Sequence, residues 1–128
     1  MTVSAFFGVS LEPPLIAVSV DQQAATLQVI RQSGHFAVNV LSAEQATLSD
    51  RFAWIDEAVR FVGVALHENP EAQSPLLEGA LLHLDCELSA MHSAGDHVLC
   101  VGSVSLALWH PGEPLLFHGS RYHRLAPL

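Results

Sequence analysis

The clearest pattern along the chain is a strict alternation of apolar and polar residues between residues 82 and 90. Leucine, cysteine and alanine occupy the even positions from Leu82 to Ala90, and polar residues occupy the odd positions from His83 to Ser89. A period of two is typical of a half-buried β-strand. Ser93–Asp96 then has the composition of a turn, and Val98–Leu108 is again strand-like. We therefore predict a long antiparallel hairpin.

The register of this hairpin decides how its two cysteines are interpreted. A tight turn centred between Ala94 and Gly95 would place Cys86 opposite Ser103 and Cys100 opposite Ser89. No secretory signal precedes the chain's first strand-like segment. We therefore expect two buried free thiols rather than a disulfide.

The remaining patterns predict short strands, with two helices between them. For the first helix, Thr26 is the expected N-cap, Leu27 and Ile30 share a face, and Gly34 supplies the C-terminal stop. The other expected segments are β-compatible Thr2–Phe7, a loop at Gly8–Pro14, strands at Leu15–Val20 and Phe36–Leu41, a helix from about Ala43 to Ala53, a strand near Val62–His67, a loop around Asn69–Pro75, a turn at Pro111–Gly112, a strand at Leu115–His118 and a tail at Arg121–Leu128. This order favours a mainly β fold, an antiparallel sheet or barrel with helices at its ends.

Composition narrows the class of protein. The 128 residues suit one domain, and 50% apolar with 14% charged residues excludes a disordered chain. Five arginines, no lysine and a net charge of −8 disfavour nucleic-acid binding. No apolar run is long enough for a membrane helix, so we expect a cytoplasmic chain with no membrane or nucleic-acid partner. The high apolar content also predicts a homo-oligomer, most simply a two-fold dimer.

Eight histidines raise the question of a metal site. No histidine pair has helical i, i+4 spacing, and no cysteines lie two to four residues apart. The expected register makes His92 and His97 cross-strand neighbours, where they could hold a metal, bind an anion when protonated or simply flank the turn. Because no third ligand is identifiable, we predict no metal site.

Two further motifs have both a functional and a plain structural interpretation. Asp96 beside His97 could fix the imidazole so that it stacks on a planar ligand, or His97 could be a solvated turn residue. The N-terminus of the first helix could bind a phosphate with the help of Thr26, or Thr26 could only cap its own helix. A serine-hydrolase elbow, a P-loop and a dinucleotide-binding glycine motif are absent, which excludes an ordinary Rossmann domain.

Four stretches in the same order resemble the flavin reductase-like family, which has the FMN-binding split barrel. They are Met1–Phe6 leading to Val9–Leu15, Ser33–Leu41, Pro75–Ala80, and Ala94–His97 followed by Val101–Val104. Tyr122 after Gly119 also fits the pattern, and the resemblance covers nearly the whole chain. It implies a homodimeric, antiparallel Greek-key split barrel. It also implies a reductase that oxidises NADH or NADPH, reduces FMN or FAD, and supplies a partner monooxygenase.

The resemblance also implies the positions of the site. Thr2, Val3, Ser4 and Ala5 would lie against the isoalloxazine, and Val20 and Asp21 would flank the ring or the ribityl chain. Ala25 and Thr26 would meet the phosphate, and His97 would lie where the nicotinamide approaches. No catalytic side chain is expected, since hydride transfer is carried by the two cofactors and the protein orients them.

Two departures from the family pattern qualify this expectation. Family members carry a helix and first strands before the segment equivalent to Met1–Thr2, so we expect the barrel to be N-terminally shortened, through a truncated chain, a mis-set start codon or a naturally short paralogue. That shortening would expose a sheet edge. Ala24 and Ala25 replace hydroxyl residues at the phosphate loop, which weakens binding by roughly 1 kcal/mol per lost hydrogen bond. The alternatives are a non-catalytic, degenerate flavin-binding protein and a purely structural dimer subunit.

Overall fold

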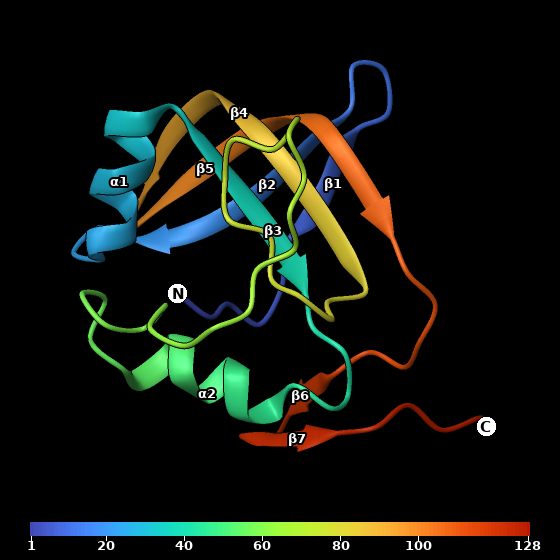
Figure 1. Cartoon of the computed structure of the whole chain (residues 1–128). Coiled ribbons are helices and arrows are strands. Elements are labelled where there is room, and N and C mark those ends of the chain that lie inside the picture. Colours follow the sequence, from blue (N-terminus) through green and yellow to red (C-terminus); the bar gives the residue numbers. More distant parts are fainter.

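The order of helices and strands follows the predicted pattern closely. The computed structural model describes residues 1–128. Its elements are β1 (Phe7–Ser10), β2 (Leu15–Asp21), α1 (Ala25–Ser33), β3 (His35–Val40), α2 (Ala46–Trp54), β4 (Leu82–Ala94), β5 (His97–Trp109), β6 (Leu116–His118) and β7 (Arg121–His123) (Figure 1). The expectation of a mainly β chain with two short helices is confirmed.

One antiparallel sheet forms the body of the molecule. Its five strands follow the order β1-β2-β5-β4-β3, so the long β4–β5 hairpin lies at the centre. The inner faces of these strands and one face of α1 enclose the core. A separate two-stranded hairpin, β6–β7, lies beside α2 (Figure 1). No helix has the length and apolar character needed to cross a membrane.

Helix α1 closes one end of the sheet. Its Leu27 and Ile30 are buried, as their spacing predicted, and Gly34 ends the helix at φ 74°, a left-handed conformation that glycine adopts without strain. The predicted N-cap is wrong. Ala24 occupies that position without a side-chain hydrogen bond, and Thr26 lies one residue inside the helix. The helix starts earlier because the backbone N–H of Ala24 bonds to the Asp21 carbonyl at 3.0 Å, which turns the chain directly from β2.

The predicted register of the β4–β5 hairpin is also wrong. The turn places Ala94 opposite His97, with Gly95 at φ 63°, and irregularities near Asp85/Cys86 and Leu88/Ala90 shift the pairing further. The observed partners are Cys86 with Val104, Cys100 with Met91 and His92 with Leu99, so His92 and His97 are not cross-strand neighbours. Alternation alone carries no information about such bulges. Both cysteines are free and buried, as expected.

Several short segments differ from their predicted states. The first strand, β1, begins at the last residue of the β-compatible segment Thr2–Phe7 and extends into the expected Gly8–Pro14 loop, because residues 7–10 pair with β2. The expected strand near Val62–His67 contributes only an isolated bridge between Leu66 and Leu77. The expected tail contains β7, which pairs with β6. All three differences depend on pairing partners distant in sequence, which a local pattern does not specify.

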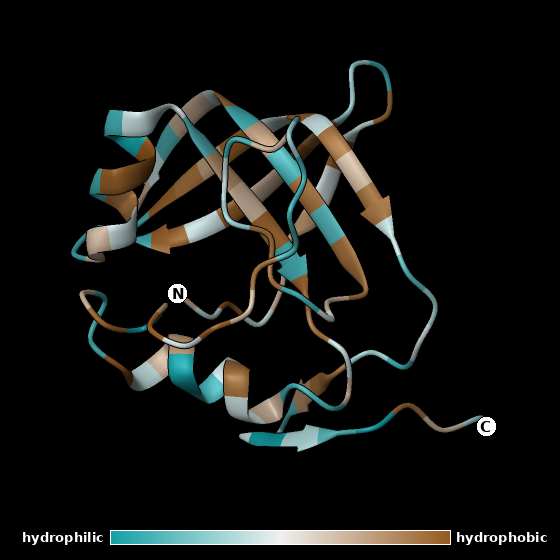
Figure 2. Ribbon diagram, viewed as in Figure 1, coloured by the Kyte–Doolittle hydropathy of each residue, from teal (hydrophilic) through white to brown (hydrophobic).

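Residues 65–80 form a folded loop, here called the strap, that crosses the outer face of β3 and β4 (Figure 1). Two polar residues beneath it, His83 and Asp85, are each only 1% exposed, although they occupy the polar side of the predicted half-buried strand. Figure 2 shows this hydrophilic character on β4 where the strap covers it. The strap therefore buries a face that the alternation pattern assigns to solvent.

Polar side chains hold the strap in place. His83 Nε2–H donates to the Leu77 carbonyl at 2.7 Å, and Asp85 Oδ2 accepts from the Gln73 N–H at 2.6 Å. From β3, Asn39 Oδ1 accepts from the Leu77 N–H at 2.8 Å. Because buried polar groups are costly unless hydrogen-bonded, these bonds offset part of the cost of burying His83 and Asp85. His83 Nδ1 and Asp85 Oδ1 have no partner beneath the strap.

Candidate functional site

The end of β2 brings together four residues that the sequence assigned to the site. Asp21, the last residue of β2, pairs with His97, the first residue of β5. The next residue, Gln22, donates its backbone N–H to the Asp96 carbonyl at 2.9 Å. Ala25 and Thr26 follow directly as the first turn of α1. A strand end, a helix start and a hairpin turn thus meet at one edge of the sheet.

Val20 belongs to the same region but faces the opposite way. Its side chain is 1% exposed and packs in the core with Leu27 and Val98. Only the backbone of Val20 is therefore available to a ligand at this edge.

The start of α1 carries unused hydrogen-bond donors. The backbone N–H groups of Ala25 and Thr26 donate to no group of the chain, while the preceding Gln23 N–H is taken by Asp21 Oδ1 at 2.8 Å. Both residues are half-buried, and no acidic residue lies in the first turn. Free N–H groups at the positive end of a helix dipole suit a phosphate or another anion. The donor set thus fits a nucleotide phosphate, with one hydroxyl at Thr26 and methyl groups at Ala24 and Ala25.

His97 is oriented by its neighbour. Its Nδ1 lies 2.8 Å from Asp96 Oδ1, and its side chain is 42% exposed. This hydrogen bond lowers the pKa of the Asp96 carboxyl, because it favours the ionised form. With Nδ1 held by the carboxylate, the ring has a fixed orientation and its Nε2 edge is left for another partner. That His97 contacts a planar ligand stays a prediction.

The N-terminal segment forms a second group, tied to α2. Thr2 Oγ1 donates to the Ser49 carbonyl at 2.6 Å, so this hydroxyl proton is already used within the chain. Val3, Ser4 and Ala5 are exposed, and Phe6 packs against the core. Burial, assisted by the charge of Arg60, lowers the pKa of the terminal amine to about 6. This one hydrogen bond anchors the segment at Thr2 and leaves the next three residues available.

Sequence reasoning missed the polar group that supports this anchor. Ser49, in the middle of α2, is 4% exposed, and its hydroxyl lies 3.1 Å from the phenol oxygen of Tyr122 on β7. The Tyr122 hydroxyl donates to Asp50 Oδ1 at 2.6 Å. The one available signal was Tyr122 after Gly119, which the sequence marked as part of a pattern without a role.

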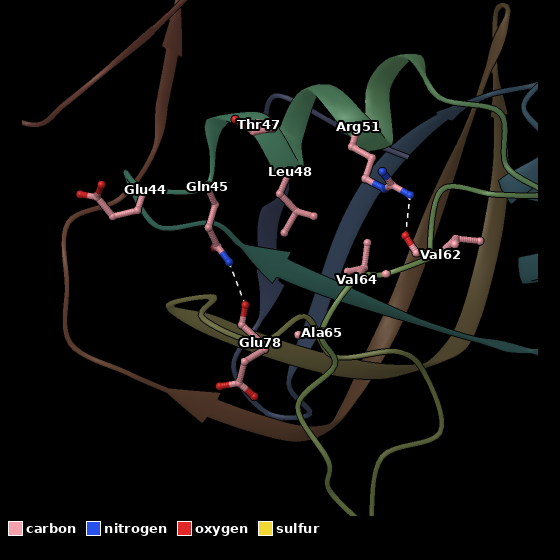
Figure 3. A pocket seen from close by; sticks show the side chains of 10 residues that line it. Glu44, Gln45, Thr47, Leu48, Arg51, Val62, Val64, Ala65 and Glu78 are labelled. Atoms are coloured by element: carbon pink, nitrogen blue, oxygen red, sulfur yellow. Dashed lines mark hydrogen bonds between the residues drawn. The ribbon is translucent and has the colours of Figure 1, made fainter.

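A cavity of about 390 Å³ lies between α2 and residues 62–65. Its polar side chains are occupied in holding the chain together. Arg51 donates to the Val62 carbonyl at 2.7 Å, and Gln45 Nε2 donates to the Glu78 carbonyl at 2.8 Å (Figure 3). We interpret this cavity as part of the packing interface between α2 and the strap rather than as a binding site.

Three histidine rings cluster at the side of the strap. The ring centroids of His67, His83 and His110 lie 5.3 to 5.9 Å apart. No group of three histidine, cysteine, aspartate or glutamate side chains is arranged to hold a metal ion. The sequence did not single out these three histidines, since they come from a loop, a strand and the end of another strand.

Comparison with known proteins identifies the class of site. A family model described as the flavin reductase like domain matches residues 1–126. An NADH-dependent flavin reductase of a Rhodococcus species is 40% identical over 131 residues, covering 98% of this chain and 69% of the relative. The FMN reductase (NADH) SmoA of Agrobacterium fabrum is 37% identical over 126 residues, covering 98% and 71%. The flavin-dependent monooxygenase reductase subunit HsaB of Rhodococcus jostii is 38% identical over 123 residues, covering 95% and 62%.

Solved structures agree with this assignment. The NADH:FAD oxidoreductase SgcE6 of Streptomyces globisporus superposes with a TM-score of 0.91 at 36% identity, covering 98% of this chain and 76% of that one. The same oxidoreductase has been solved with NAD and FAD fragments, with a TM-score of 0.88. These matches confirm the predicted split-barrel fold class and the resemblance on which it rested.

Proposed function

The chain belongs to the flavin reductase-like domain family, and we propose that it is an NAD(P)H:flavin oxidoreductase that transfers hydride from NADH or NADPH to FMN or FAD. The observation that carries the proposal is the edge at β2, where free backbone donors of α1 stand beside an oriented His97. The flavin, when bound, supplies the hydride-accepting ring. The protein's part is to bind and align two planar partners.

Each site residue has a part in this alignment. The N–H groups of Ala25 and Thr26 hold the flavin phosphate, and Asp21 sits at the ribityl side. Val3, Ser4 and Ala5 lie against the isoalloxazine, with Thr2 fixing the start of that segment. His97 contacts the nicotinamide. Support comes from the exposure of residues 3–5 and from the unused donors of α1. Holding both rings in contact geometry accounts for much of such a reaction's acceleration.

The flavin reductase works as a homodimer in the cytoplasm, where NADH and NADPH are available, and passes reduced flavin to a monooxygenase. The dimer is supported by apolar side chains that one copy leaves exposed, including Phe7 (54%), Leu11 (94%) and Trp109 (74%). Phe7 lies on β1, a sheet edge that a second copy would cover. The monooxygenase partner is supported by the relative named as a monooxygenase reductase subunit.

The test is a coupled binding and turnover assay. Purified chain is titrated with FMN and with FAD by quenching of flavin fluorescence, and NADH and NADPH oxidation is then followed at 340 nm. We expect saturable flavin binding in the micromolar range and flavin-dependent oxidation of at least one nicotinamide. Substitution of His97→Ala should raise KM for the nicotinamide while leaving the flavin Kd within about twofold.

The two alternatives give different results in the same assay. Flavin binding without nicotinamide oxidation would indicate the degenerate binding protein, which the methyl groups at Ala24 and Ala25 favour. A stable dimer that binds no flavin would indicate the structural subunit. His92→Ala is a matched control for His97→Ala, because His92 lies further along the same hairpin, paired with Leu99.

A further inference from the structure

The single tyrosine of the chain connects three segments that are distant in sequence. Tyr122 lies on β7, 72 residues from Asp50 and 73 residues from Ser49, and its hydroxyl reaches both. The hydrogen bond to the Asp50 carboxylate raises the pKa of the Tyr122 phenol, because the carboxylate accepts a proton that only the neutral hydroxyl can donate. The β6–β7 hairpin is thereby fixed to the middle of α2.

The other side of the same helical turn holds the N-terminal segment. Thr2 Oγ1 donates to the carbonyl of Ser49, the residue whose hydroxyl meets Tyr122. Ser49 is buried, and its carbonyl and hydroxyl face two different neighbours, Thr2 and Tyr122. Tyr122, Ser49 and Thr2 thus form a continuous set of contacts from the C-terminal hairpin, across α2, to the segment before β1.

We propose that Tyr122 is a positioning residue for flavin, acting through Ser49 to fix Thr2 and the exposed residues that follow it. This rests on the proposed function, in which residues 3–5 contact the isoalloxazine and Thr2 fixes the start of that segment. Thr2 is the only residue of that segment whose side chain is hydrogen-bonded to the rest of the chain. A shift of Ser49 therefore shifts the start of the flavin-contacting segment. Small displacements of positioning groups have large effects on alignment.

Other contacts keep α2 folded and attached to the rest of the chain when the Tyr122 hydroxyl is removed. Arg51 donates to the carbonyls of Val59, Arg60 and Val62 at 2.6 to 3.1 Å, which ties the helix to the following loop. Arg124 bridges Glu44 and Glu113 at 2.7 and 3.0 Å. These anchors are independent of the phenol. Tyr122→Phe is therefore expected to fold. It should lose only the two hydrogen bonds that set the position of α2 relative to the β6–β7 hairpin.

The first experiment compares FMN binding and steady-state turnover in the wild type, Tyr122→Phe, Ser49→Ala and Thr2→Val. We expect each variant to raise the Kd and KM for FMN about three- to tenfold, while kcat at saturating FMN stays within twofold. The double variant Tyr122→Phe/Thr2→Val should be no weaker than the worse single variant, because both remove one connected set of contacts. Thr47→Val is the matched control, since Thr47 is exposed on the same helix.

A second readout separates positioning from simple structural support. Because the chain has one tyrosine, 13C-labelling of the tyrosine ring gives a single Cζ signal that reports on Tyr122. In the wild type this signal should move when FMN is added, and the movement should be lost in Thr2→Val. A Cζ signal that does not move when FMN is added, or a Tyr122→Phe variant with the wild-type Kd for FMN, overturns the positioning role. Neither result affects the proposed reductase function. A wild type that binds no flavin overturns the proposed function itself, and the positioning role with it.

Discussion

Gly102, on the central strand β5, allows close packing against Phe36 and Cys86, and replacing it with alanine should destabilise the protein. A Cβ added there would lie 2.6 Å from Phe36 Cζ and 2.7 Å from Cys86 Cβ. Ordinary contacts between carbon atoms are about 3.5–4.0 Å, so both neighbours would have to move by about 1 Å. The Phe36 ring can turn, but Cys86 Cβ is fixed to the backbone of β4.

The cost follows from how firmly Gly102 is held. It pairs with Ile16 on β2 and with Leu88 on β4, so β5 cannot shift without disturbing two neighbouring strands. Overpacking of this kind costs about 1–3 kcal/mol. Alanine recovers about 0.5–1 kcal/mol because it restricts the unfolded chain. The expected net loss is therefore about 0.5–2 kcal/mol, which lowers the ratio of folded to unfolded protein roughly 2- to 30-fold.

The assay is urea unfolding followed by fluorescence of the two tryptophans, at one fixed protein concentration because a dimer's stability depends on it. Gly8→Ala on β1 is the matched control, since an added Cβ there meets no atom within 4 Å. It should be neutral or slightly stabilising, and Phe36→Leu should recover part of the loss in Gly102→Ala. Equal midpoints for the two glycine variants would refute the packing argument.

Three further predictions concern other parts of the fold. His83→Leu should cost about 1–3 kcal/mol, because the buried Leu77 carbonyl loses its donor; urea unfolding measures the loss, and faster hydrogen exchange confined to residues 65–80 would locate it in the strap. Ala24→Ser should stabilise the chain by about 0.5–2 kcal/mol by supplying the missing N-cap of α1, and an unchanged urea midpoint would contradict that cap assignment. Burial raises the pKa of the Cys86 thiol to about 12 and also raises that of Cys100. Both thiols should therefore resist a thiol reagent at pH 8 until the chain unfolds. The thiols of the unfolded chain ionise at a lower pH than those of the folded chain, so the free energy of unfolding should fall as the pH rises above about 9. A urea midpoint that stays constant from pH 8 to 10 would be inconsistent with this.

Local patterns determined much of this fold. The period-two alternation located β4, the Leu27–Ile30 spacing and Gly34 located α1, and four motifs in a fixed order were enough to identify the family. These features depend on neighbouring residues, and the physics that produces them acts over a few positions.

The sequence predicted which residues belong to the site, whereas only the tertiary structure showed which of their backbone groups are unused. The motifs predicted that Asp21, Thr26 and His97 belong to one site, and the β2–β5 register brings them to one edge. The structure alone showed that Ala24 is the N-cap, leaving the Ala25 and Thr26 N–H groups unused. The sequence favoured Thr26 as the cap because cap residues are recognised by side-chain type, whereas this one is set by the turn out of β2.

Contacts between distant segments were decided only by the tertiary structure. No local pattern predicts that His83 and Asp85 are buried, because their exposure depends on a strap whose own residues have no regular periodicity. The same holds for Tyr122, which meets Ser49 across 73 residues. Which face of a strand meets water, and which loop covers it, is determined by the whole chain, since burial is a property of the packed assembly and not of any local segment.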